Sequence, residues 1–159
     1  YEPDFPAFIK AVRAAGITAP VLGSDGIDSP TTLGLGEVGE GIVFSNGGFA
    51  TPDSALAKFY ADYKAGTGAE PDTVYIATGY DLVKLIDAAL AAAGGKMDGK
   101  SLRDAIDGID NLAVTTGSIT YKGRNRIPLR NVALNKVVGG KKEFVSSAIP
   151  DAADVPEPK

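Results

Sequence analysis

Asp25 is the residue best placed to recognise a small ligand, because it stands in a turn directly after a short apolar segment. In α/β sheets, ligands bind in the crevice beyond the carboxyl ends of the strands. The flanking Gly23 and Gly26 would let a ligand approach the backbone, and a carboxylate there suits a ligand ammonium group. An aspartate in such a turn more often forms an Asx turn with its own backbone. Spacing alone leaves both roles open.

Two further candidates are aromatic. Tyr75 and Tyr80 stand at the start of the longest predicted helix. A tyrosine offers an apolar wall with one polar group, which suits a small amphipathic ligand. Core packing is the commoner role for each ring taken alone. Tyr1 is ambiguous because no residue precedes it.

Several kinds of catalytic chemistry are absent from the composition. The chain has no cysteine and no histidine, which excludes disulfides, thiolate chemistry, most hydrolase triads and most zinc sites. Asp104, Asp107 and Asp110 do not converge on one point at their spacing, so a solvated helix face is favoured over a metal site. The spacing of Asp25 and Asp28 does not place them as an acid/base pair. We therefore expect no metal, no cofactor and no enzymatic activity.

A glycine pattern at residues 34–39, GLGEVG, matches the dinucleotide-binding fingerprint GxGxxG. That fingerprint needs a strand before it and a helix after it. Here a helical turn precedes the pattern and a strand follows it. A glycine-rich turn is the favoured interpretation.

The charge distribution argues against a nucleic-acid partner. The net charge is -4, whereas binding a polyanion needs a concentrated basic face. The densest basic group is interrupted by a glycine and a proline, which favours a solvated loop; it comprises Lys122, Arg124, Arg126 and Arg130.

The elements that must position these residues follow from hydrophobic periodicity. Helices are expected at 5–15, 52–66, 75–93 and 101–108, with a helical turn at 31–35. We expect Thr51 and Pro52 to cap the second helix, and Ser101 with Asp104 to form a capping box for the last. Strands are expected at 19–23, 41–45, 117–121, 131–138 and 143–147, the last two joined by a Gly139-Gly140 turn. This alternation predicts an α/β layered architecture with parallel pairing.

Polar breaks near 46–52 and 123–130 divide the chain into three parts. Such a division fits a chain that leaves one lobe, visits another and returns. No apolar run approaches the ~20 residues that span a bilayer. The first residue is not methionine, so we expect the chain to derive from a longer polypeptide.

Five segments resemble one family when taken in order. They are YEPDFPAFIK at 1–10, RAAGITAPVLGSDG at 13–26, EGIVF at 40–44, EPD at 70–72 and GYDLVKLI at 79–86. Together they resemble the branched-chain amino-acid-binding proteins of ABC transporters, which have the type I periplasmic-binding-protein fold. The likeness runs from residue 1 to about residue 149.

This resemblance implies parts of two three-layer α/β lobes joined by hinge strands, with the N-terminal half missing. Residues 1–46 would belong to lobe 2, 47–128 to lobe 1 and 129–150 again to lobe 2, with 151–159 a flexible tail. The two polar breaks would be hinge crossings.

The resemblance also implies a function. The chain would be part of an extracytoplasmic solute-binding protein that delivers a branched-chain amino acid, or a similar amino-acid, amide or carboxylate ligand, to an ABC transporter permease. Carried over position by position, Asp25 would receive the ligand amine, and Tyr1 and Tyr75 would line the cleft. Residues that grip the ligand carboxylate would lie upstream of Tyr1. The precursor would carry a signal peptide, and the protein would be periplasmic, or lipid-anchored in a Gram-positive organism.

The resemblance also leaves an alternative function open and implies that the fragment associates with another polypeptide. The alternative function is a ligand-sensing module of a receptor or regulator with the same fold. The sheets would also lack their central strands and expose unpaired edges, so we expect the fragment to associate with its missing half or with another copy.

Overall fold

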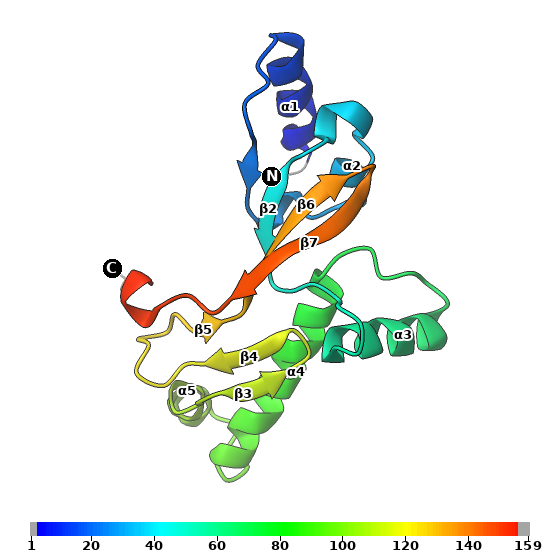
Figure 1. Cartoon of the computed structure of the whole chain (residues 1–159). Coiled ribbons are helices and arrows are strands. Elements are labelled where there is room, and N and C mark those ends of the chain that lie inside the picture. Colours follow the sequence, from blue (N-terminus) through cyan, green and yellow to red (C-terminus); the bar gives the residue numbers. More distant parts are fainter. Residues whose placement is uncertain (1–2, 156–159) are drawn as a thin grey trace.

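The computed structural model describes residues 3–155, which form two units, each built around its own sheet (Figure 1). The upper unit holds a four-stranded sheet of order β1-β2-β6-β7 and the lower unit a three-stranded sheet of order β3-β4-β5. Helices α1 (Asp4–Ala14) and α2 (Pro30–Leu33) belong to the upper unit, and α3 (Ala55–Thr67), α4 (Tyr75–Ala92) and α5 (Gly99–Asp107) to the lower one. The predicted α/β class is confirmed.

The sheet of the upper unit combines strands from distant parts of the chain. β1 (Leu22–Gly23) pairs in parallel with β2 (Val43–Asn46), as predicted. β2 then pairs antiparallel with β6 (Val132–Val138), which forms a hairpin with β7 (Lys141–Ala148). A buried core joins the sheet to α1; it comprises Ile9, Ile27, Ile42, Phe44 and Val137.

In the lower unit, α4 packs against α5 and the short strand β3 (Leu112–Val114). β3 pairs with β4 (Gly117–Thr120), which pairs with β5 (Leu129–Arg130). Leu85 and Ala89 of α4 meet Ile109 in one buried cluster. Asp81 of α4 fixes the β3–β4 turn, because its carboxylate accepts bonds from the backbone N–H of Thr115 at 2.6 Å and of Thr116 at 3.0 Å.

The helix caps differ from those expected. α3 begins at Ala55, where the Ser54 hydroxyl accepts from the N–H of Ala57 at 3.1 Å, so the predicted Thr51-Pro52 start is wrong. The helix also runs past Gly66 and ends at Gly68, whose positive φ of 74° suits glycine. Asp98, not Ser101, caps α5 by accepting from Ser101 N–H. The N-cap residue is the one whose side chain reaches a free N–H group of the first helical turn. In α5 this residue is Asp98.

The strands agree less closely than the helices with the ranges expected from the sequence. β1 has two residues where five were expected, and β3 and β5 were not predicted at all. The 3₁₀ turn η2 (Gly36–Gly39) lies in the glycine pattern at 34–39 and is followed by β2. This order confirms that the pattern lacks the strand-before-helix context of a dinucleotide site.

The chain passes between the units at two places. It leaves the upper sheet after Asn46 and returns where β5 ends at Arg130 and β6 begins at Val132. A last 3₁₀ turn, η3 (Ala152–Asp154), lies beside the lower unit in Figure 1.

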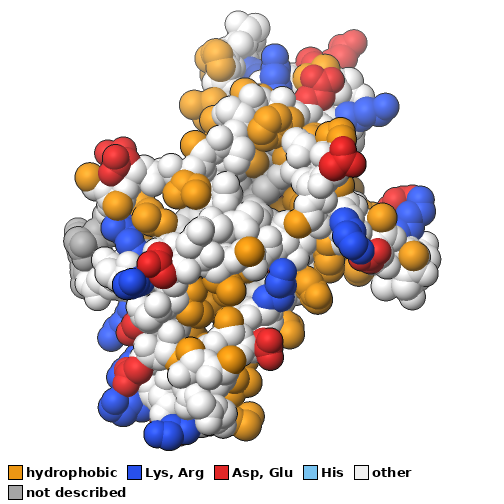
Figure 2. Space-filling view, turned by 60° about the horizontal axis from the view of Figure 1, so that its bottom comes forward, with side chains coloured by type: hydrophobic (Ala, Val, Ile, Leu, Met, Phe, Trp, Pro, Cys, Tyr) orange, Lys and Arg blue, Asp and Glu red, His pale blue; other side chains and the backbone are white. Residues whose placement is uncertain are grey.

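Apolar side chains remain at the surface. In Figure 2 hydrophobic side chains reach the surface between charged ones, which lie mostly at the periphery of that view. On α4, Leu82, Val83 and Ile86 are all exposed. Within residues 3–155, no helix is both long and apolar enough to cross a membrane.

Candidate functional site

A cavity of about 300 Å³ opens where the two units meet. The upper unit contributes Asp25 and the end of β2, and the lower unit contributes the first turn of α4 with Tyr75 and Thr78. The second crossing closes a further side with Arg130. This volume suits a small molecule.

Asp25 begins the 3₁₀ turn η1 (Asp25–Ile27), directly after β1. Its side chain is exposed, and among the described residues its carboxylate takes part in no hydrogen bond or ion pair. The Asx turn that the sequence left open is therefore not formed by this side chain. An unpaired carboxylate at a cavity wall can accept hydrogen bonds from a ligand ammonium group.

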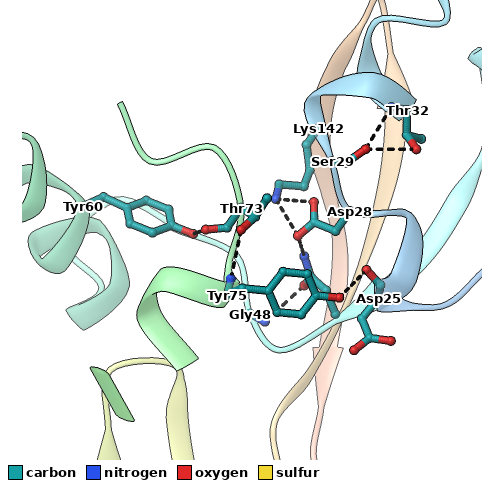
Figure 3. Close-up of polar contacts among 10 residues, drawn as sticks. Asp25, Asp28, Ser29, Thr32, Gly48, Tyr60, Thr73, Tyr75 and Lys142 are labelled. Atoms are coloured by element: carbon teal, nitrogen blue, oxygen red, sulfur yellow. Dashed lines mark hydrogen bonds and ion pairs between the residues drawn. The ribbon is translucent and has the colours of Figure 1, made fainter. Parts of the chain in front are cut away.

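Tyr75 reaches the same place from α4. It is the first residue of that helix, is 46% exposed, and its hydroxyl donates to the backbone carbonyl of Asp25 at 2.7 Å. Figure 3 shows the ring lying across the gap between the units. The structure thus brings Asp25 and Tyr75 together, although 50 residues separate them. Tyr1 lies outside the described residues.

Tyr80 does not contribute to the cavity. Its ring stacks on Phe59 of α3 with centroids 5.1 Å apart. Five residues past Tyr75, it points to another side of α4. The packing role that the sequence favoured for such a ring applies here.

Asp28 belongs to a buried polar cluster that the sequence did not predict. It is 2% exposed, and its carboxylate meets the Nζ of Lys142 at 2.8 and 3.1 Å (Figure 3). The Nδ2 of Asn46 donates to the same carboxylate at 2.8 Å, while its Oδ1 accepts from the N–H of Gly48. These contacts use the Asp28 carboxylate, which leaves Asp25 without a partner acid in the cavity.

Only part of this cluster had a signal in the sequence. Asn46 follows a predicted strand, where polar residues often line a site. Lys142 is 114 residues from Asp28, and no local pattern indicates that pairing. The Asp28–Lys142 contact depends on tertiary packing, which hydrophobic periodicity in the sequence does not reveal.

Tyr60 of α3 lies beside this cluster, and its hydroxyl donates to the Thr73 carbonyl at 3.4 Å (Figure 3). Burial, helped by the nearby charges of Asp28 and Asp72, raises the pKa of Tyr60 to about 12. The phenol is therefore held in its neutral form.

The basic group of the second crossing is not a solvated loop throughout. Arg124 and Arg130 are half-buried, and the Nη2 of Arg124 donates to the Ala152 carbonyl at 3.2 Å. The prediction is therefore wrong for these two arginines. Periodicity cannot show which charged side chains fold back against the rest of the chain. In the described part of the chain, no group of three or more acidic residues could hold a metal ion.

Comparison with known proteins gives consistent matches. A family model described as periplasmic binding protein matches residues 1–142. A leucine-binding protein of Thermotoga maritima has a similar structure, with 28% identity and a TM-score of 0.80, over 95% of this chain and 43% of its own. A solute-binding protein of an ABC transporter from R. palustris, solved with benzoate, shares 26% identity with a TM-score of 0.69, over 91% of this chain and 40% of its own.

A third similar structure comes from Rhodopseudomonas palustris BisB5, a solute-binding protein in complex with 3,4-dihydroxy benzoic acid. It shares 26% identity with a TM-score of 0.71, over 96% of this chain and 44% of its own. The chain therefore spans about two fifths of the length of these solved structures. A search of the curated proteins found no match.

Proposed function

The chain belongs to the periplasmic binding protein family, and on that premise we propose that it is part of an extracytoplasmic solute-binding protein serving an ABC transporter. Its ligand is a branched-chain amino acid or a similar small amino-acid, amide or carboxylate compound. The observation that carries this proposal is the cavity between the two units, which Asp25 lines from one side and Tyr75 from the other.

The arrangement of the sheets supports two lobes. The four-stranded sheet draws its strands from 22–46 and 132–148, and the three-stranded sheet from 112–130. In our proposal, residues 1–46 and 129–150 belong to lobe 2, residues 47–128 to lobe 1, and 151–159 form a tail. The crossings act as hinges on which the lobes close over the ligand.

Asp25 pairs with the ligand ammonium in this proposal, while Tyr1 and Tyr75 enclose its apolar part. The Tyr75–Asp25 bond brings the two units into contact at the cavity, which is the arrangement that a closed, ligand-holding state needs. A membrane permease receives the loaded protein. The chain also associates with the remainder of the fold or with a second copy of itself.

The ligands of similar proteins are the compounds to test first. One is a leucine-binding protein and others were solved with benzoate or a dihydroxybenzoate. Calorimetric titration of the full-length protein that contains this chain, with branched-chain amino acids and benzoates, tests the proposal. We expect saturable one-to-one binding of at least one of them. Absence of binding to every amino acid, amide and small carboxylate tried would refute it.

Replacing the proposed ammonium partner gives a sharper test. Asp25→Ala should weaken binding of an amine-bearing ligand by roughly 2 kcal/mol, because the ammonium loses a charged partner. The backbone carbonyl that accepts from Tyr75 is retained. Asp87→Ala removes another exposed carboxylate, from α4, and should leave the affinity unchanged. Equal affinities for wild type and Asp25→Ala would remove Asp25 from the site.

A further inference from the structure

Arg130 lines the same cavity as Asp25 and has no ligand role in the function proposed above. It ends β5, where the chain returns to the upper unit, and is half-buried. The cavity therefore has a cationic side chain and an anionic one in its wall. A guanidinium at such a place matches a carboxylate in charge and in planar geometry.

A chain of hydrogen bonds positions this guanidinium. Its Nη2 donates to the Thr116 hydroxyl at 3.0 Å, and that hydroxyl in turn donates to the Asp81 carboxylate at 2.7 Å. Thr116 and Asp81 are both buried. Because Asp81 also fixes the β3–β4 turn, the arginine is held by a rigid part of the lower unit.

The guanidinium keeps unused donor capacity. Its Nε is buried without a hydrogen-bond partner, and among residues 3–155 no carboxylate forms an ion pair with it. A buried donor left without a partner costs ~1–3 kcal/mol, and a desolvated charge is normally paired. The missing counter-charge suits a site whose anionic partner arrives with the ligand, whereas the enclosed Nε cannot itself meet that ligand.

Gly47, at the first crossing, leaves room for this guanidinium. A Cβ there would lie 3.0 Å from the Nη2 of Arg130, which is closer than real Cβ atoms normally come. Glycine thus lets the guanidinium lie against the backbone of the crossing. The two crossings therefore meet at Arg130, on the wall of the cavity.

We propose that Arg130 adds a cationic contact to the ligand carboxylate, as an anion-binding subsite at the junction of the two crossings, beside the carboxylate-binding residues expected upstream of Tyr1. The inference rests on the proposed function and makes it more specific. An α-amino acid would use both Asp25 and Arg130, whereas an aromatic acid would use Arg130 alone. The carboxylate is the group that both ligand classes share.

The test compares acids with their amides in the full-length protein. L-leucine, benzoate, leucinamide and benzamide are titrated calorimetrically into wild type, Arg130→Gln and Arg130→Lys. Arg130→Gln should weaken the acid that binds by about 10- to 100-fold, the loss expected for a charge-assisted hydrogen bond. The amide of that acid should change by less than about threefold, and Arg130→Lys should recover part of the acid affinity because it keeps the charge.

Two controls separate recognition from folding. Arg126→Gln removes the same charge from an exposed position in the turn before β5 and should leave acid binding unchanged. A merely structural role of Arg130 would weaken acid and amide binding together, and that result would overturn the subsite. So would an acid affinity in Arg130→Gln equal to that of wild type. A wild-type protein that binds neither acid nor amide would instead overturn the proposed function, and the subsite with it.

Discussion

At the scale of single residues, two aspartates of one turn have opposite environments. Asp25 is exposed at the cavity, whereas Asp28 is buried against Lys142 and Asn46. The 3₁₀ turn η1 begins at Asp25 and ends just before Asp28, and it turns their side chains apart. One carboxylate is thus available to a ligand while the other stabilises the fold, although only three positions separate them in the sequence.

Tyr60 gives a residue-scale prediction for alkaline pH. Burial raises its pKa to about 12 in the folded protein, against ~10 in an unfolded chain. Between these values the unfolded state loses the phenolic proton and the folded state keeps it. The folded state then binds more protons, so stability falls as pH rises from about 10 to 12. Urea unfolding of the wild type across this range should show the loss.

The contribution of Tyr60 can be isolated by substitution. Tyr60→Phe removes the titrating group, so its stability should fall less steeply than that of wild type over the same pH range. Tyr63→Phe, on the same helix and against the same Phe59 ring as Tyr60, serves as the matched control and should keep the wild-type slope. Identical slopes for wild type and Tyr60→Phe would contradict the assignment.

At the scale of elements, the Asp28 cluster adds a side-chain link between three segments of the upper unit. Asp28 follows η1, Asn46 ends β2, and Lys142 lies on β7. The cluster is at the point where the chain leaves the upper sheet. We infer that it fixes the direction in which the first crossing departs.

Removing one partner of this buried ion pair should cost stability. Asp28→Asn leaves the Lys142 ammonium, whose side chain is only 19% exposed, without its counter-charge. We expect a loss of about 2–4 kcal/mol in the free energy of unfolding, because an uncompensated buried charge is strongly unfavourable. Urea denaturation of the full-length protein measures it, and Asp28→Asn with Lys142→Met should recover part of the loss.

An exposed ion pair provides the comparison. Lys58 and Asp62 pair at 2.6 Å on α3 with both side chains largely exposed. Asp62→Asn should change stability far less than Asp28→Asn, since solvent screens such exposed pairs. A loss in Asp28→Asn no larger than in Asp62→Asn would show that the buried pair adds nothing.

The elements also show where the sequence is informative. The apolar stripe with Leu85 and Ala89 predicted α4 to within one residue, because a long periodic run specifies a helix strongly. β1 and β5 have two residues each, too few for any period. Asp25 and Tyr75 were predicted as site residues from strand-end position and from the family resemblance. Arg130 and Lys142 were not, since their positions depend on contacts across the fold.

At the scale of the whole molecule, the surface includes an unpaired strand edge and exposed apolar side chains. β1 is an edge strand with Leu22 largely exposed, and α4 exposes Leu82 and Val83. The similar solved structures are more than twice as long. Exposed strand edges and apolar helix faces favour association with another polypeptide.

We therefore predict that the chain of residues 1–159, produced by itself, self-associates through α4. Leu82 and Val83 are 57% and 63% exposed, so pairing two copies removes apolar surface from water, at ~25 cal/mol per Å². Light scattering over a range of concentrations should give a mass above that of the monomer. Leu82→Glu with Val83→Glu should shift the equilibrium toward monomer, because a charge is costly in an apolar interface. Met97→Glu, at another exposed apolar residue beyond the end of α4, should not. A monodisperse wild-type monomer at all concentrations would contradict the prediction.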